Sequence, residues 1–123
     1  MIHFSNDKHT FTLPSEEQAA TWLKNTILAE NKQIGDVDIV FTSDENLLDI
    51  NVKYLNHNYL TDIITFDYCI EDIIHGELYI SIDRVAENAT LHEATFEKEL
   101  HRVMVHGVLH LLGYKDKLPE QQV

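Results

Sequence analysis

Apolar residues follow a helical spacing through the last part of the chain. Residues 96–112 contain few helix-breaking residues, and the spacing of their apolar positions predicts one long helix. These positions are Phe96, Leu100, Val103, Met104 and Leu111. Gly113 follows directly, and glycine is the residue best suited to the left-handed turn after a helix. We therefore expect the helix to end there.

Three shorter helices are predicted upstream, over residues 15–31, 44–55 and 83–89. Ser15 is placed to cap the first of them, and Asp83 is placed to cap the third, because side-chain oxygens at these positions can accept hydrogen bonds from free backbone amides. Thr90 and Thr95 are both possible caps for the long C-terminal helix, and the sequence does not choose between them.

The strand predictions rest on alternation and on β-forming residues. Residues 36–42 and 77–82 are predicted strands, and at least one of the short segments 2–5 and 10–13 should be another. The segment 61–68 is almost continuously apolar, which indicates a central strand covered on both faces. Helices alternate with strands, so the expected fold is α+β, with a mixed sheet of about four strands packed with helices.

Length and composition indicate one domain over residues 1–123. No apolar run approaches the ~20 residues of a membrane span, and the N-terminus lacks the basic-then-apolar order of a signal peptide. Cys69 is the single cysteine, which rules out an internal disulfide and suits a reducing compartment. We expect a cytoplasmic protein that does not bind membranes.

The net charge of −12 argues against loose binding of nucleic acid through a basic surface. No DNA partner is expected, and an RNA substrate would require the nine basic residues to be concentrated in one place. Two of them, Lys115 and Lys117, flank Asp116.

His106 and His110 are the strongest candidates for metal ligands. On a helix they lie about 40° apart on one face and one turn from each other, so both imidazoles can reach one ion. The chain turns at Gly113, and Asp116 can then return as a third ligand. Three protein ligands with a fourth position left to water are the arrangement of a catalytic zinc site. The alternative is that both histidines are hydrogen-bonded residues of the core.

Three nearby polar residues have simpler interpretations. His101 lies about 140° around the helix from His106 and should face solvent. Glu99 shares the face of His106 but lies about 10 Å along the helix axis, too far for a direct ligand. His57 precedes the apolar strand; it could line a cleft, but a surface position is the simpler interpretation.

Peptide hydrolysis is disfavoured by one residue. In zinc proteases with the motif H-E-x-x-H, the glutamate beside the first histidine is the general base. Gly107 occupies that position here. The downstream spacing resembles the metal cradle of the metzincin proteases, but a cradle without the base makes a metzincin-like metalloprotease the less favoured alternative.

The segment from His106 to Tyr114 resembles the signature H-G-x-L-H-L-x-G-Y-D-H of the YbeY family, the metal-dependent endoribonucleases of ribosomal RNA maturation. Residues 51–54 (N-V-K-Y), 61–66 (T-D-I-I-T-F) and 76–80 (G-E-L-Y-I) are similar to the family's N-x-x-Y, T-D-V-L-S-F and G-D-I-x-I segments, in the same order. The resemblance implies a zinc-dependent, single-strand-specific endoribonuclease. Its expected partner is ribosomal RNA or a ribosomal subunit.

The chain departs from the family pattern at three positions. The third histidine of the signature falls on Asp116, and the aspartate before it falls on Lys115. Aspartate is a competent zinc ligand. The family's arginine after N-x-x-Y, which the resemblance links to RNA cleavage, falls on Leu55. Arg84, Lys53 or Lys115 would have to replace the positive charge of that arginine, and we take Arg84 and Lys115 as the candidate catalytic residues, which would contact phosphate. The rival interpretation, a non-catalytic ribosome-assembly factor with a structural metal, is favoured by Leu55 and by the acidic composition.

Overall fold

The computed structural model describes residues 1–7 and 10–114 of the chain. Within these residues the chain forms four strands and four helices. In chain order they are β1 (Ile2–Asn6), α1 (Glu16–Ala29), β2 (Gln33–Thr42), α2 (Asp44–Leu55), β3 (Ile63–Asp67), β4 (Ile73–Ser81), α3 (Ile82–Leu91) and α4 (Phe96–Leu111). That residues 1–123 form a single domain stays a prediction.

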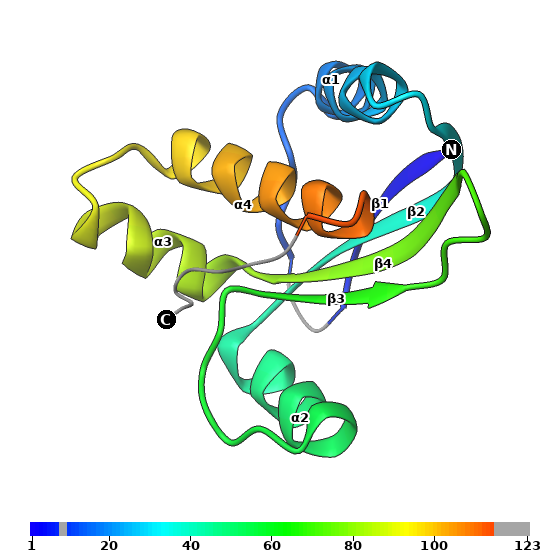
Figure 1. Cartoon of the computed structure of the whole chain (residues 1–123). Coiled ribbons are helices and arrows are strands. Elements are labelled where there is room, and N and C mark those ends of the chain that lie inside the picture. The colour runs from blue at the N-terminus through cyan, green and yellow to red at the C-terminus, as the bar shows by residue number, and fades with distance from the viewer. Residues whose placement is uncertain (8–9, 115–123) are drawn as a thin grey trace.

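The four strands make one mixed sheet in the order β1-β2-β4-β3 (Figure 1). Strands β1, β2 and β4 are parallel, and β3 is antiparallel to β4. The predicted α+β fold and mixed sheet are confirmed. The prediction that residues 61–68 form a central strand is wrong, because β3 is an edge strand among the described residues. Helix α4 and helix α2 both contact β3. The apolar character of this segment is therefore explained by helices that cover its two faces, and it does not require a strand on each side.

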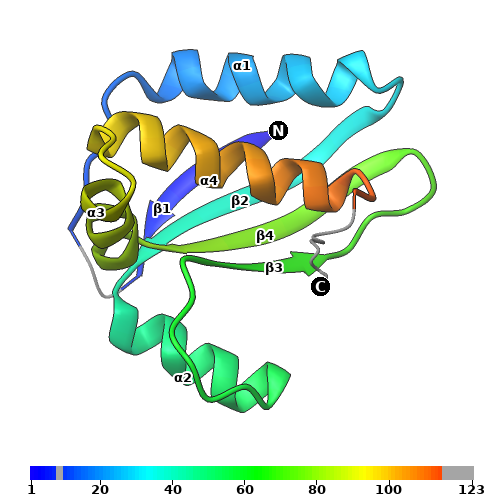
Figure 2. The ribbon, with the colours of Figure 1, turned by 60° about the vertical axis from the view of Figure 1, so that its left-hand side comes forward.

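Helices α1 and α4 lie on one face of the sheet and α2 lies on the other (Figure 1, Figure 2). The main core fills the space between the sheet and the helices α1 and α4. Alternate residues of β2 and β4 point into it, as the period-2 pattern of these segments predicts. The core side chains from these elements include Leu23, Ile27, Val37, Ile39, Phe41, Leu78, Ile80, Leu100, Val103, Met104 and Val108.

Residues 10–13 do not form a strand, although their composition allowed one. The side chain of Asn6 bonds both backbone groups of Phe11: its Oδ1 accepts from the backbone nitrogen at 3.1 Å and its Nδ2 donates to the carbonyl at 2.8 Å. These bonds satisfy the backbone polar groups that a sheet partner would otherwise take. The Phe11 ring packs edge-on against Phe41, with 5.0 Å between centroids.

Two of the predicted helix caps are wrong. Ser15 precedes α1 with a left-handed backbone (φ 59°), and its side chain makes no capping hydrogen bond. Helix α3 begins earlier than predicted because β4 runs directly into it, so Ser81 is the cap and its Oγ accepts from the Arg84 nitrogen at 3.0 Å. Asp83 lies inside the first turn. Of the two candidates for α4, Thr95 is the cap.

The serines that precede α2 and α1, one a cap and the other not, yield a matched pair of stability predictions. The Ser43 side chain accepts a hydrogen bond from the Asn46 nitrogen at 3.2 Å and so caps α2. Ser43→Ala should lower the free energy of unfolding by about 1 kcal/mol. Ser15→Ala, which removes no capping bond, should change it by less than about 0.5 kcal/mol. Urea unfolding of both variants checks this, and equal losses would contradict the assignment of the caps.

Candidate functional site

His106 and His110 line one pocket of about 380 Å³, which we call the histidine pocket. They enter it from consecutive turns of α4. The opposite wall comes from the end of α2, the segment that follows it, and β3. The remaining lining residues are Asn51, Leu55, His57, Tyr59, Thr61, Ile63, Ile64 and Thr65. The sequence prediction that the two histidines share one face is confirmed.

Gly107 explains how α4 comes close enough to the sheet to form this wall. A Cβ atom at position 107 would lie 2.7 Å from Cδ1 of Ile63 and 2.9 Å from Cδ1 of Leu78, closer than carbon atoms approach. Glycine lets the helix backbone rest on β3 and β4 at this distance without displacing the Ile63 and Leu78 side chains. The residue that stands where zinc proteases carry their base is therefore a packing contact.

The end of α4 turns the chain sharply after the second histidine. Gly113 has φ 99°, the left-handed conformation that the sequence predicts for it. The Gly113 nitrogen donates to the His110 carbonyl at 3.1 Å, and the Tyr114 nitrogen donates to the Leu109 carbonyl at 3.0 Å. This paired pattern satisfies the last carbonyls of the helix. The left-handed turn at Gly113 therefore ends the helix three residues after His110.

The predicted third ligand lies beyond the described part of the chain. Lys115 and Asp116 both belong to residues 115–123, which are outside it. Within residues 1–7 and 10–114, no three side chains of His, Cys, Asp or Glu are placed to hold a metal ion. Two imidazoles one turn apart are a donor set that suits zinc, and they need at least one further ligand to make a protein site.

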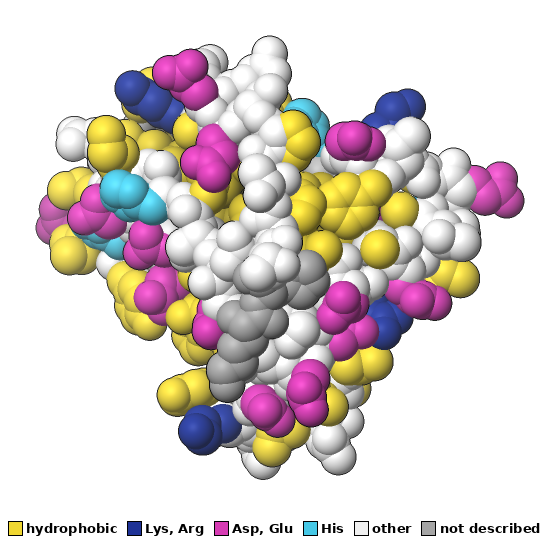
Figure 3. Space-filling view, turned by 180° about the vertical axis from the view of Figure 1, so that it is seen from behind, with side chains coloured by type: hydrophobic (Ala, Val, Ile, Leu, Met, Phe, Trp, Pro, Cys, Tyr) yellow, Lys and Arg dark blue, Asp and Glu magenta, His cyan; other side chains and the backbone are white. Residues whose placement is uncertain are grey.

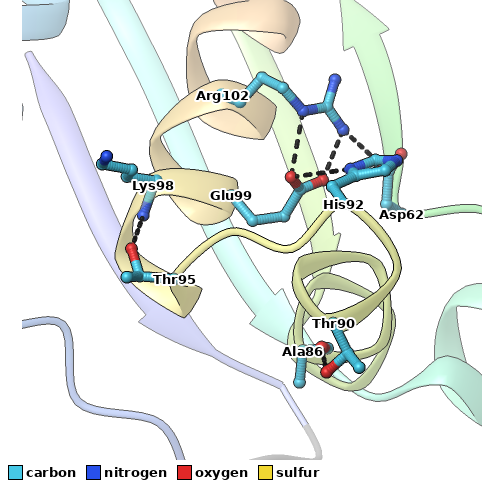
Figure 4. Close-up of polar contacts among 8 residues, drawn as sticks. All are labelled: Asp62, Ala86, Thr90, His92, Thr95, Lys98, Glu99 and Arg102. Carbon is cyan, nitrogen blue, oxygen red and sulfur yellow. Dashed lines mark hydrogen bonds and ion pairs between the residues drawn. The ribbon is translucent and has the colours of Figure 1, made fainter.

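A buried acidic group lies on α4 two turns before His106 (Figure 4). Glu99 is only 2% exposed, and it accepts hydrogen bonds from Arg102 Nη2 at 2.6 Å and Nε at 3.3 Å. Its Oε1 also lies 3.2 Å from His92 Nδ1. The bonds from Arg102, more than those from His92, hold the pKa of Glu99 below its ordinary value, against the opposing effect of burial. Sequence reasoning considered Glu99 only as a metal ligand and missed this network.

Asp62, directly before β3, joins this network to the histidine pocket. Its Oδ2 lies 3.6 Å from Nη2 of Arg102. Burial raises the pKa of Asp62, while the positive charges of Arg102 and of His106 oppose that rise. The same carboxyl group is therefore within electrostatic range of Arg102 and of a pocket histidine. The sequence did contain a signal that Arg102 lies on the same side of the helix as the two pocket histidines, because residues 102, 106 and 110 are spaced by four.

The lowered pKa of Glu99 predicts a loss of stability in acid. A carboxylate whose pKa is lower in the folded state stabilises the fold above its ordinary value, here 4.5, and that contribution disappears as the pH falls towards the folded value. Below pH 4.5 the thermal midpoint of the wild type should fall more steeply than that of Glu99→Gln. Glu97→Gln removes an exposed carboxylate from the same helix and is the control. Parallel curves for wild type and Glu99→Gln would contradict the assignment.

His57 and His101 occupy different environments. His57 is exposed, as its loop position suggested, but it also lines the histidine pocket, where its Nδ1 lies 3.0 Å from the Tyr59 hydroxyl. His101 is exposed and stacks on Trp22 with 3.9 Å between ring centroids. It belongs to the contact between α1 and α4 and is not one of the pocket-lining residues, as predicted.

Arg84, a candidate for contact with phosphate, lies at the start of α3. Its Nη2 donates to Asp44 Oδ2 at 2.9 Å, which ties α3 to the start of α2. It is not one of the described side chains that line the histidine pocket. Contact between Arg84 and phosphate stays a prediction, and so does the role of Lys115.

The rest of the surface offers little attraction to a polyanion. On the face opposite to that of Figure 1, acidic side chains outnumber basic ones (Figure 3). This agrees with the 21 acidic and nine basic residues of the chain. A hydrophobic groove between α1 and α4, lined by Phe11, Trp22, Phe96 and Leu100 among others, is separate from the histidine pocket, and neither His106 nor His110 lines it. None of the described helices is long and apolar enough to cross a membrane.

The sequence profile of the family described as Endoribonuclease YbeY matches residues 1–123. The chain belongs to the YbeY family. Endoribonuclease YbeY of Flavobacterium psychrophilum is 51% identical over 117 residues, which cover 95% of this chain and 83% of that protein. Endoribonuclease YbeY of Bacteroides thetaiotaomicron is 44% identical over 107 residues, covering 87% and 78% of the two chains. Family membership agrees with the resemblance in the histidine signature and disfavours the metzincin alternative.

The fold also matches a solved structure. The solution structure of a Thermotoga maritima protein superposes with a TM-score of 0.62 and 28% sequence identity. The match covers 100% of this chain and 79% of that one. The arrangement of helices and sheet described above is therefore shared with an experimentally determined structure.

Proposed function

We propose that this chain is a metal-dependent endoribonuclease that hydrolyses single-stranded RNA in the maturation of ribosomal RNA and the assembly of the ribosome, in the cytoplasm. One observation carries the proposal: two imidazoles on consecutive turns of α4 line a single pocket, in a chain whose relatives are named Endoribonuclease YbeY. The proposed partner is ribosomal RNA or a ribosomal subunit.

We assign the metal, zinc, to His106, His110 and Asp116. When bound, zinc supplies a Lewis acid that activates water and polarises a phosphoryl oxygen. The chain's own part is to present two imidazole nitrogens from one helix face, and Asp116, which follows Gly113 in the sequence, is assigned as the third ligand. The contact of Gly107 with the sheet fixes the helix, and therefore both imidazoles, against the wall formed by β3.

The opposite wall of the pocket offers a reason for a preference for single strands. The rings of His57 and Tyr59 stack with 5.2 Å between centroids, and Tyr59 is 57% exposed. Bases of a single strand can stack on such rings, whereas bases inside a duplex are already stacked and paired. Arg84 and Lys115 remain our candidates for contact with phosphate.

The test compares a single-stranded RNA oligonucleotide with the same sequence in a duplex. Purified protein should cleave the single strand, lose that activity after zinc is removed by a chelator, and regain it when zinc is added back. The duplex should be cleaved at least about tenfold more slowly. Cleavage that persists at full rate after elemental analysis shows the metal to be gone would contradict the proposal.

A non-catalytic role in ribosome assembly is the second candidate, and one observation favours it. Leu55 lines the histidine pocket, so an apolar side chain stands where the family resemblance places an arginine. This role predicts stoichiometric metal and co-sedimentation with ribosomal subunits, without cleavage of single-stranded RNA. The same preparation of wild-type protein therefore decides between the two functions.

A further inference from the structure

Arg102 lies on the face of α4 that carries the two pocket histidines. Residues 102, 106 and 110 are spaced by four, so each lies about 40° around the helix and about 6 Å along its axis from the next. The three side chains therefore form a short row, with Arg102 one turn before His106. A guanidinium in this row extends the surface that the histidines present to a ligand.

The position of Asp62 places this guanidinium beside the histidine pocket. Asp62 lies between Thr61 and Ile63, both of which line the pocket. The distance from Arg102 Nη2 to Asp62 Oδ2 is 3.6 Å. The close-up in Figure 4 shows Arg102 reaching from α4 towards Asp62. Neither Arg102 nor Asp62 is one of the lining residues, but the contact with Asp62 places Arg102 next to the wall that β3 contributes to the pocket.

Glu99 holds the guanidinium in a defined orientation. Its buried carboxylate engages Nε and Nη2 of Arg102, while the arginine side chain remains 52% exposed. A guanidinium carries five N–H donors in a rigid plane, so an arginine held along one edge can still donate from another. An arginine fixed in this way is a preorganised cation, which loses little side-chain entropy on binding an anion.

We propose that Arg102 contacts a phosphate of the RNA strand that occupies the histidine pocket. The proposal rests on the RNA-cleaving function proposed above and adds a residue to it. Phosphodiester cleavage develops negative charge, and an acidic chain needs a cation beside its site to offset the repulsion of its own carboxylates. Arginine offers bidentate donors that match phosphate oxygens. The competing interpretation is that Arg102 only neutralises the buried charge of Glu99.

Three variants separate these interpretations. Arg102→Gln alone leaves Glu99 buried without its cation, so a loss of folding could mask the effect. The double variant Glu99→Gln/Arg102→Gln removes both charges together, and Glu99→Gln alone is its reference. Lys24→Gln, on the exposed face of α1, removes one positive charge elsewhere and is the control. Thermal unfolding and elemental analysis of each variant establish that fold and bound metal are retained.

RNA affinity is measured first, on a single-stranded oligonucleotide in chelator so that no cleavage occurs. Relative to Glu99→Gln, the double variant should bind roughly tenfold more weakly. The slope of log affinity against log salt should fall in magnitude by about 0.7, the value for one lost phosphate contact to a single strand. Lys24→Gln should leave the slope of the wild type unchanged. With zinc restored, cleavage by the double variant should be roughly 10- to 100-fold slower than by Glu99→Gln.

The outcomes for Arg102 and for the proposed function are distinguishable. Equal affinity, salt slope and cleavage for Glu99→Gln and the double variant would overturn the contact with phosphate, even if the wild type is an active nuclease. A wild type that binds single-stranded RNA through Arg102 but never cleaves it would support the contact and contradict the nuclease function. A wild type with no affinity for single-stranded RNA would overturn both.

Discussion

Replacement of His110 by alanine is expected to remove the bound metal and to reduce RNA cleavage by more than about 100-fold. The substitution leaves one imidazole and the proposed Asp116 to hold the ion, fewer than the three protein ligands of a catalytic zinc site. His110 is exposed at the end of α4, so its loss should change the free energy of unfolding of the metal-free protein by less than about 0.5 kcal/mol. Elemental analysis and cleavage of single-stranded RNA measure the two effects.

His101→Ala is the matched control for this experiment. It removes an imidazole from the same helix, but one that stacks on Trp22 and does not line the histidine pocket. The control should keep its metal and its cleavage rate, with a small loss of stability from the lost stacking. Stoichiometric zinc in His110→Ala would exclude His110 as a ligand. Metal bound by the wild type without any cleavage would instead favour the assembly role. It would also indicate that Leu55, at the position of the family's arginine, is the reason for the lack of cleavage.

The periodic pattern of the sequence predicted the helices and strands well because each rests on local rules. The long helix predicted over 96–112 is α4, and Gly113 ends it with the expected left-handed turn. The face shared by His106 and His110 follows from helix geometry alone. Once α4 forms, the two imidazoles must point to the same side whatever the rest of the chain does.

Features that depend on distant parts of the chain were not predictable in this way. The edge position of β3 depends on strand order, which a hydrophobic run does not encode. The contact between Arg102 and Asp62 joins residues 40 positions apart. The burial of Glu99 likewise results from tertiary packing, since its sequence neighbours are those of an ordinary amphipathic helix.

Gly107→Glu is expected to prevent folding, although it would create the H-E-x-x-H motif of zinc proteases. The position is buried, and even a Cβ would lie 2.7 Å from the Ile63 side chain and 2.9 Å from that of Leu78. Overpacking of a core costs about 1–3 kcal/mol, and a buried carboxylate without a partner costs several kcal/mol more. The sum is comparable to the whole stability of a small domain, about 5–15 kcal/mol. Circular dichroism and thermal unfolding measure the loss.

Gly107→Ala separates the steric effect from the charge. It adds only the Cβ, and the neighbouring atoms are the far ends of the flexible Ile63 and Leu78 side chains, which can move aside. Alanine also stabilises a helix by up to about 1 kcal/mol relative to glycine. Gly107→Ala should therefore fold, with a stability within about 2 kcal/mol of the wild type. A folded Gly107→Glu with a wild-type midpoint would show that α4 does not depend on this close approach, and would reopen the protease interpretation that Gly107 disfavours.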